Sequence, residues 1–217
     1  MTLSEENYLK AIYHLSRDAQ DEVSTNAIAE AMETKASSVT DMIKKLSEKK
    51  LVKYKRYQGA KLTEEGRLYA VNVIRKHRLW EVFLVEKLNF SWDEVHEVAE
   101  QLEHIKSDKL IEELDVFLDN PSVDPHGDPI PDRHGNIQPS SKVLLATLRA
   151  GEQGVCVGVR NSSREFLQYL DKLGISLGDE LKVLSREPFD NSMLIGTGDR
   201  KLSVSSLTAN NLYVKKI

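Results

Sequence analysis

The stretch VHEVAEQLEH, residues 95–104, sorts polar and apolar side chains onto two faces of a predicted helix. At about 100° per residue, four side chains with nitrogen or oxygen donors fall within one sector about 100° wide: His96, Glu100, Glu103 and His104. The opposite side is apolar, with Val95, Val98, Ala99, Leu102 and Ile105. The polar sector is either an ordinary solvent-exposed face or part of a metal site.

A second pair of donors lies upstream, in the segment RKHRLWE of residues 75–81. His77 and Glu81 are separated by four residues, so they share a face of a helix. Imidazole nitrogens and carboxylate oxygens that converge from two helices are ligands for a divalent transition metal. This pair favours a metal site over an ordinary solvent-exposed face, and features elsewhere in the chain are needed to choose between the two.

Length and composition indicate a globular protein. The chain has 217 residues, 40% of them hydrophobic, which allows one large domain or two to three small ones. No apolar run approaches the ~20 residues of a membrane span. The first residues do not resemble a signal peptide, and the one cysteine, Cys156, cannot form an internal disulfide. We therefore expect a cytoplasmic protein.

The net charge of −4 hides a segregation of charge along the chain. Residues 35–61 carry nine basic and two acidic side chains, a net charge of +7. Residues 91–132 carry thirteen acidic and two basic side chains, a net charge of −11. The first segment could contact phosphates and the second could hold cations.

The basic segment has the pattern of a winged helix. Residues 23–32 and 36–46 predict two short helices joined by about four residues, a helix-turn-helix. Residues 51–55 and 60–63 flank a turn that contains Gly59, which predicts a basic hairpin. The combination predicts DNA binding. We expect the side chains that face DNA to be Lys35, Ser37, Ser38, Thr40, Asp41, Lys44, Lys45 and Arg56.

The remaining chain predicts a mainly α protein with a β domain at its C-terminal end. Ser4 is expected to cap the first helix. A long apolar helix from Glu64 to Phe90 predicts a helical dimer interface. Five of the six prolines fall in residues 121–141, and glycine-rich short strands follow. The predicted domains are a winged helix-turn-helix (1–63), a helical metal-binding and dimerisation domain (64–120), a linker (121–141) and a small β-barrel (142–217).

This order of domains resembles the diphtheria toxin repressor family of iron- and manganese-dependent transcriptional regulators. The residues that carry the likeness are RKHRL (75–79), the 95–104 stretch with Ser107 and Asp108, and PHGDPIP (125–131). The resemblance implies a homodimeric repressor that binds a palindromic operator when loaded with metal. It also implies an FeoA-like β-barrel and two metal positions. The primary position would take Asn7, Glu100, Glu103 and His104, and the ancillary position His77, Glu81 and His96.

The chain departs from the pattern of the family at several of these positions. Iron-type members generally have methionine and cysteine at the positions of Asn7 and Glu100, whereas manganese-type members have aspartate and glutamate. Lys10 replaces a glutamate of the short manganese-type members. Some three-domain members donate a cysteine from the linker, where this chain has Asp124.

We expect no enzyme activity. The set of oxygen and nitrogen ligands favours Mn(II) and then Fe(II) as the bound metal ion. We expect that Zn(II) or Co(II) can also bind in vitro. Three alternatives remain open. They are a carboxylate-bridged metalloenzyme, a DNA-binding protein whose metal is purely structural, and a sensor of a small ligand held in the β-barrel. His126 and His134 are interpreted as polar loop residues.

Overall fold

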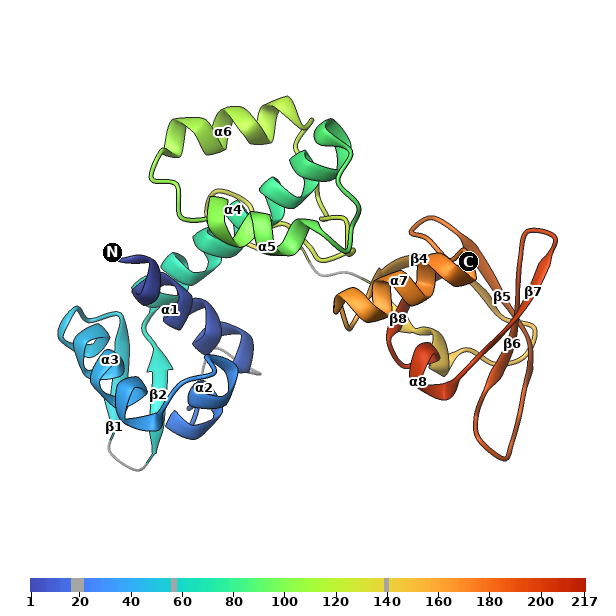
Figure 1. Ribbon diagram of the computed structural model, residues 1–217, viewed down its shortest axis with the longest axis horizontal. Coiled ribbons are helices and arrows are strands. Elements are labelled where there is room, and N and C mark those ends of the chain that lie inside the picture. The colour runs from blue at the N-terminus through green and yellow to red at the C-terminus, as the bar shows by residue number, and fades with distance from the viewer. Residues whose placement is uncertain (17–21, 56–57, 139–140) are drawn as a thin grey trace. The chain divides into compact units, whose positions relative to one another are not determined.

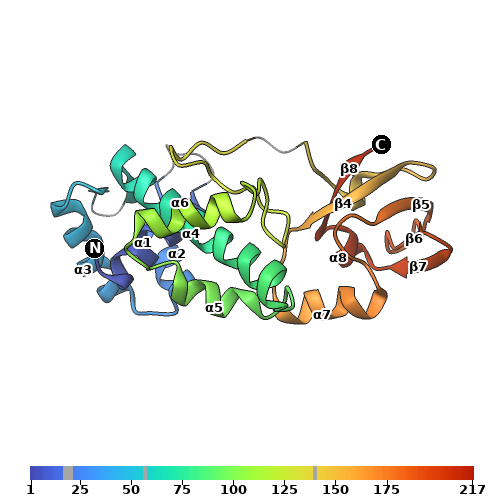
Figure 2. The ribbon, with the colours of Figure 1, turned by 90° about the horizontal axis from the view of Figure 1, so that it is seen from above.

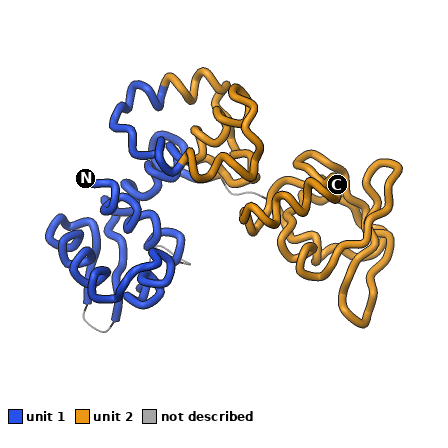
Figure 3. Tube along the Cα trace, in the orientation of Figure 1, with its two compact units in different colours: residues 1–77, 100–112, 131–137 blue, residues 78–99, 113–130, 138–217 orange. Residues whose placement is uncertain are grey.

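The computed structural model describes residues 1–16, 22–55, 58–138 and 141–217. The chain forms two compact units, each made of segments that are not contiguous in sequence (Figure 3). The first unit comprises Met1–His77, Glu100–Glu112 and Pro131–Ile137, and the second comprises Arg78–Ala99, Glu113–Ile130 and Gln138–Ile217. No helix among the described residues combines the length and apolar character needed to cross a membrane.

The first unit contains the winged helix that the sequence predicts. Its elements are α1 (Leu3–Leu15), α2 (Thr25–Ala31), α3 (Ala36–Glu48), β1 (Val52–Lys55) and β2 (Gly59–Leu62). α2 and α3 lie side by side, and β1 pairs with β2 in an antiparallel hairpin next to α3 (Figure 1). Leu9 and Ile12 of α1, Ile28 of α2, and Ile43 and Leu46 of α3 are fully buried in one apolar core. The prediction of a helix-turn-helix with a hairpin is confirmed.

The cap of α1 differs from the prediction. Thr2, not Ser4, is the N-cap residue, and its hydroxyl accepts a hydrogen bond from the backbone N–H of Glu5. The Glu5 carboxylate accepts in turn from the backbone N–H of Thr2, which completes a capping box. The helix therefore begins at Leu3, two residues before the start that a Ser4 cap would give.

Three helices follow the hairpin. They are α4 (Glu64–Leu88), α5 (Val95–Leu102) and α6 (Asp108–Phe117). The division between the two units falls within α4, after His77, and within α6, after Glu112. α4 ends two residues earlier than the predicted Phe90, at a turn where Asn89 adopts a positive φ of 58°.

The C-terminal part of the second unit is a six-stranded antiparallel sheet. Its strand order is β3-β8-β4-β5-β6-β7, and helix α7 (Arg164–Leu173) packs on it through Leu167 and Leu170 (Figure 2). The predicted mainly α fold with a C-terminal β domain is confirmed. The elements are β3 (Val143–Leu144), the 3-10 helix η1 (Leu145–Thr147), β4 (Gln153–Val159), β5 (Glu180–Arg186), β6 (Met193–Thr197), β7 (Arg200–Val204), α8 (Ser206–Ala209) and β8 (Leu212–Lys216).

Within the second unit, the proline-rich segment packs closely against strand β4. Gly127 has a positive φ of 80°, and a Cβ atom there would lie 1.9 Å from the carbonyl oxygen of Val157. The carbonyl oxygen of His126 accepts a hydrogen bond from the backbone N–H of Val159 at 3.0 Å. Glycine is therefore required at residue 127 both by the backbone conformation and by the space available.

Candidate metal centres

The donor-bearing helix is shorter than the sequence predicts. α5 ends at Leu102, so His96 and Glu100 lie on the helix whereas Glu103 and His104 lie in the turn that follows. The prediction that all four share one helix face is wrong for the last two. The turn directs Glu103 into the protein, where its side chain has 0% exposure, while the side chain of Glu100 on the helix is 51% exposed.

The first cluster consists of Asn7, Glu100, Glu103 and His104, and Glu103 is its central carboxylate. Its Oε1 atom accepts a hydrogen bond from the Nζ atom of Lys10 at 2.7 Å, and its Oε2 atom lies 2.6 Å from the Nδ1 atom of His77. Burial alone would raise the pKa of the Glu103 carboxyl, but His77 and Lys10 outweigh it and hold that pKa below its usual value. Glu103 is therefore an ionised carboxylate in a buried position.

His104 is oriented by a second carboxylate. Its Nδ1 atom lies 2.6 Å from the Oε2 atom of Glu6 on α1, and its Nε2 atom lies 3.6 Å from the Oε1 atom of Glu103. When Nδ1–H donates to Glu6, the lone pair of Nε2 is directed to the same region as Glu103. A carboxylate that fixes the tautomer in this way is the usual outer partner of a metal-ligating histidine.

Asn7 supplies an oxygen atom that lacks a partner. Its Oδ1 atom is buried and accepts no hydrogen bond from any residue that the structure describes. A buried polar atom without a partner costs about 1–3 kcal/mol, so such atoms in proteins usually serve a ligand or bind water. Asn7 also lines a hollow of about 430 Å³, together with Lys10 and Glu100.

These residues fit a divalent metal ion. Asn7 offers an oxygen without a partner and Glu103 offers an ionised carboxylate. His104 offers its Nε2 atom when Nδ1–H donates to Glu6. Glu100 is placed to join them, since its Oε1 atom lies 3.5 Å from the same Lys10 ammonium that contacts Glu103. The set contains oxygen and nitrogen donors without sulfur, which suits Mn²⁺ and Fe²⁺.

A second cluster lies wholly within the second unit. Glu81, Asp124 and His126 are all buried, and one potential ligand atom from each lies within 4.8 Å of the others. The interpretation of His126 as a polar loop residue is wrong, because this residue is buried at 4% exposure. His96 is more exposed, and its Nδ1 atom lies 3.5 Å from the Oε1 atom of Glu81.

The His126 ring is held in one orientation. Its Nε2 atom lies 2.8 Å from the backbone carbonyl oxygen of Trp92, so Nε2–H donates there and Nδ1 faces Glu81 at 3.5 Å. The indole of Trp92 stacks on the ring. Burial lowers the pKa of His126, but the Glu81 carboxylate outweighs this and raises the pKa to about 9. At neutral pH the ring is therefore an imidazolium that neutralises part of the charge of this cluster.

The same surroundings also raise the pKa of Asp124, which favours its neutral form, whereas the raised pKa of His126 favours the charged form. Burial, with Glu81 and Asp128 nearby, raises the pKa of its carboxyl to about 6, against the opposing effect of Arg78. The Arg78 Nε atom lies 3.4 Å from Asp124 Oδ2, and its Nη1 atom donates to the carbonyl oxygen of Pro129. The donor set of Glu81, Asp124 and His126 also consists of oxygen and nitrogen, which fits a divalent ion.

The predicted ancillary set is distributed over the two units. His77 and Glu81 lie one turn apart on α4, but His77 belongs to the first unit, where it contacts Glu103. Glu81 and His96 belong to the second unit. The assignment of these three residues to one metal position stays a prediction, as does the four-part domain division.

The predicted DNA-facing residues lie mainly on the exposed face of α3. Thr40 is half-buried, and its Oγ1 atom donates to the carbonyl oxygen of Ala36. Lys45 is half-exposed, and its Nζ atom lies 3.1 Å from Glu5 Oε1. Arg56 lies outside the described residues. The other predicted contacts are exposed: Lys35, Ser37, Ser38, Asp41 and Lys44.

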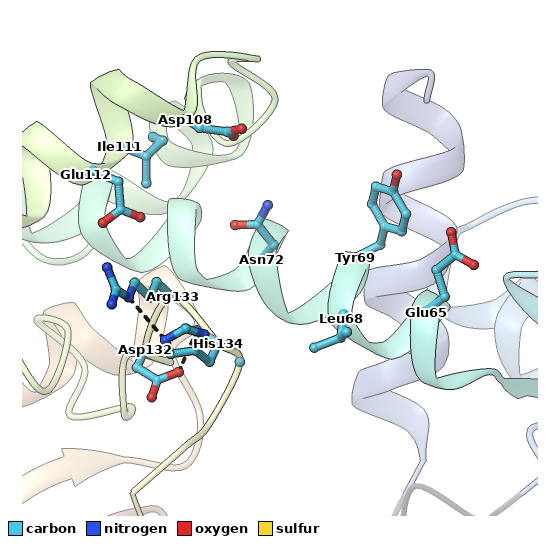
Figure 4. A pocket seen from close by; sticks show the side chains of 11 residues that line it. Glu65, Leu68, Tyr69, Asn72, Asp108, Ile111, Glu112, Asp132, Arg133 and His134 are labelled. Carbon is cyan, nitrogen blue, oxygen red and sulfur yellow. Dashed lines mark hydrogen bonds between the residues drawn. The ribbon is translucent and has the colours of Figure 1, made fainter.

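A larger hollow of about 840 Å³ lies in the first unit (Figure 4). α4 contributes Leu68 and Tyr69 to its lining, and α6 contributes Ile111. The loop of residues 132–135 forms the remaining side, where the Arg133 Nε atom donates to His134 at 3.1 Å. His134 is exposed, which agrees with its interpretation as a polar loop residue.

The fold and these clusters define a class of protein: a winged-helix protein with a β domain and clusters of nitrogen and oxygen donors that fit divalent ions. Comparisons with known proteins agree. Three family models match in chain order. They are the N-terminal DNA binding domain of iron dependent repressors (residues 1–60), their metal binding and dimerisation domain (63–132), and the FeoA domain (143–216). The chain belongs to the diphtheria toxin repressor family of metal-dependent transcriptional regulators.

Individual relatives support the same assignment. A solved manganese-dependent transcriptional repressor in complex with manganese is 36% identical, with a TM-score of 0.87 over 98% of this chain and 100% of that one. The manganese regulator SloR is 37% identical, with a TM-score of 0.75 over the whole of both chains. The iron-dependent repressor IdeR of Mycobacterium tuberculosis is 34% identical over 126 residues, 58% of this chain. The chain spans about half of that repressor, 54% of its length.

Proposed function

We propose that this chain is a metal-dependent transcriptional repressor. It binds palindromic operator DNA as a homodimer when loaded with Mn(II), or with Fe(II) as the second choice. Control of genes for metal-ion uptake follows from the family. The chain has no proposed catalytic role, and the relatives compared above are regulators by name.

One observation carries the proposal: helix α1 is shared between the DNA-binding core and the first cluster. Leu9 and Ile12 of α1 are fully buried in the core that also holds α3. The same helix presents Asn7 and Glu6 to the cluster that contains Glu103 and His104. A change in the position of Asn7 is therefore transmitted to the recognition helix through packed side chains.

The residues act as a tether between two segments of the chain. Glu103 and His104 come from the turn after α5, whereas Asn7 comes from α1. When bound, the ion would supply a divalent positive charge that Asn7, Glu100, Glu103 and His104 can all contact. Asn7 then gains a partner for its buried oxygen, which adds to the contact that Glu6 of α1 already makes with His104 in the turn. A coupling of about 1–3 kcal/mol would change operator affinity about 5- to 150-fold.

The recognition helix supplies the proposed contacts with DNA. Ser37, Ser38, Thr40 and Lys45 meet the groove, while Lys35, Lys44 and Arg56 neutralise phosphates. Asp41 lies on the same exposed face and pairs with Lys44 at 3.6 Å. In a dimer, two such helices can match half-sites about 34 Å apart.

The proposed dimer would bury apolar side chains that a single chain exposes. On α4 and α6 these include Leu88 at 52%, Val116 at 63% and Phe117 at 61% exposure, all in the second unit. Exposed apolar side chains that gather on helices favour association with another helical surface.

Fluorescence anisotropy of a labelled palindromic operator tests the proposal. Metal-stripped protein is titrated with Mn²⁺, anaerobic Fe²⁺ and Zn²⁺, and we expect high-affinity binding only after addition of Mn²⁺ or Fe²⁺. Glu103→Gln keeps the shape of the side chain but removes its charge, so this variant should lose metal-dependent binding. Glu97→Gln, an exposed change on α5, is the matched control and should bind as the wild type does.

Any other result of the anisotropy titration would support one of the alternative functions or contradict a ligand assignment. Equal operator binding in chelator would mean that the metal is structural, and the tether would be wrong. A response to Fe²⁺ alone would identify an iron-responsive regulator. Metal-dependent binding of wild-type strength in Glu103→Gln would contradict the assignment of Glu103 as a ligand.

A further inference from the structure

A lysine side chain of the protein itself, Lys10, contacts the carboxylates of the first cluster. The Lys10 ammonium lies 2.7 Å from Glu103 Oε1 and 3.5 Å from Glu100 Oε1. Its side chain is only 15% exposed, and the Glu103 side chain is fully buried. Two carboxylates that the metal proposal assigns as ligands are therefore already paired with one positive charge.

The ammonium and a metal ion compete for the same oxygen atoms. A divalent ion bonds to carboxylate oxygens at about 2.0–2.2 Å, closer than any hydrogen bond. The ammonium could stay beside Glu103 only at the cost of repulsion between two cations at short range, in a partly buried place where screening is weak. Filling the site therefore requires Lys10 to leave both carboxylates.

A hollow beside the first cluster can accept the Lys10 side chain after a metal ion displaces it. Asn7 and Lys10 are three residues apart on α1, so they share a face of the helix. Both line the hollow of about 430 Å³, and Glu33 also lines it. Lys10 can thus swing from the carboxylates into this hollow without disturbing the fully buried Leu9 and Ile12.

We propose that Lys10 is a built-in competitor of the metal ion, and that it sets the metal concentration at which the first cluster fills. In the metal-free protein its ammonium relieves the repulsion between Glu100 and Glu103 and so stabilises that state. Every binding event must displace it. This deepens the proposed function, on which it rests, by assigning to one residue the threshold of the response.

Lys10→Met tests the proposal, because it keeps the aliphatic stem and removes the charge. Affinity for Mn²⁺ is measured without DNA, by competition with a fluorescent chelator, and the Tm is measured in chelator. We expect Mn²⁺ to bind about 10- to 100-fold more tightly than to the wild type, equivalent to about 1.4–2.7 kcal/mol. The Tm of the metal-free variant should fall, because Glu100 and Glu103 lose their shared counter-charge.

Two matched variants separate charge from other effects. Lys10→Arg keeps the positive charge and should bind Mn²⁺ with an affinity close to that of the wild type. Lys49→Met removes a different lysine of the first unit, one that donates to the buried Glu5 at 2.7 Å. It should lower the Tm without changing the affinity for Mn²⁺. A gain in affinity confined to Lys10→Met supports competition.

The opposite results overturn the proposal. If Lys10→Met binds Mn²⁺ with wild-type affinity or more weakly, Lys10 is not a competitor. If Lys10→Arg gains affinity as much as Lys10→Met does, side-chain shape and not charge is responsible. Both results leave metal-gated DNA binding intact. If neither the wild type nor Lys10→Met binds a divalent ion, the proposed function fails together with this inference.

Discussion

The protonation of His126 predicts that the second cluster binds metal in a pH-dependent way. The pKa of this imidazole is raised to about 9, since Glu81 outweighs the effect of burial. A metal bond needs the neutral ring with a free lone pair on the nitrogen that faces Glu81. Below pH 9, each bound ion therefore has to displace one proton from His126.

The sign and size of the effect follow from this pKa. Because the raised pKa favours the protonated ring, affinity falls as the pH drops below about 9, by about tenfold per pH unit. At pH 7 the penalty is about two units, or about 3 kcal/mol. Asp124, with a pKa of about 6, adds a second proton only below that pH. Between pH 6.5 and 8 the change in affinity therefore reports mainly on His126.

Isothermal titration calorimetry measures this coupling directly. Zn²⁺ or Mn²⁺ is titrated at pH 6.5, 7.25 and 8.0, in pairs of buffers with different ionisation enthalpies, into a Glu103→Gln protein whose first cluster is disabled. We expect about one proton to be released per ion and affinity to rise with pH. His126→Gln, which cannot carry the proton, should lose both the slope and most of the affinity. Equal affinity at pH 6.5 and 8.0, with no proton release, would refute the reasoning.

Two predictions concern the fold. Ile43→Ala opens a cavity in the fully buried core beside α3 and should cost about 2–5 kcal/mol of unfolding free energy in urea titrations, whereas the exposed Lys44→Ala should change it by less than about 0.5 kcal/mol. Gly127→Ala should lower the Tm much more than Gly151→Ala. Both residues have a positive φ, but only a Cβ atom at residue 127 would collide with strand β4, and equal losses in the two variants would contradict the close approach.

The winged helix was predictable because its signals are local. In a helix of 3.6 residues per turn and in a short hairpin, apolar residues recur at a regular spacing that can be recognised within a few consecutive residues. The same holds for α7 (Arg164–Leu173), where the buried Leu167 and Leu170 are three residues apart, as on one face of a helix. The sheet was predicted less completely. β3 has two residues and pairs with β8 about 70 positions later, and a pairing between such distant segments leaves no local pattern.

The site was predictable in its residue types but not in its geometry. Periodicity located Glu103 and His104 but could not show that α5 ends at Leu102, since neither glycine nor proline marks that end. His126 was missed because its burial depends on distant contacts with Trp92 and Glu81. One signal was present in the sequence: Gly127 follows His126 directly, and glycine is the residue that permits a close approach of the backbone.

The two clusters solve the same electrostatic problem in different ways. Buried carboxylates cannot stay ionised in a metal-free protein without a compensating positive charge. The first cluster obtains it from the Lys10 ammonium, and the second from the His126 imidazolium together with Arg78. Binding of an ion therefore displaces a side chain in the first cluster and a proton in the second. The first cluster should thus respond to charge-removing substitutions of Lys10, and the second to pH between about 6.5 and 9.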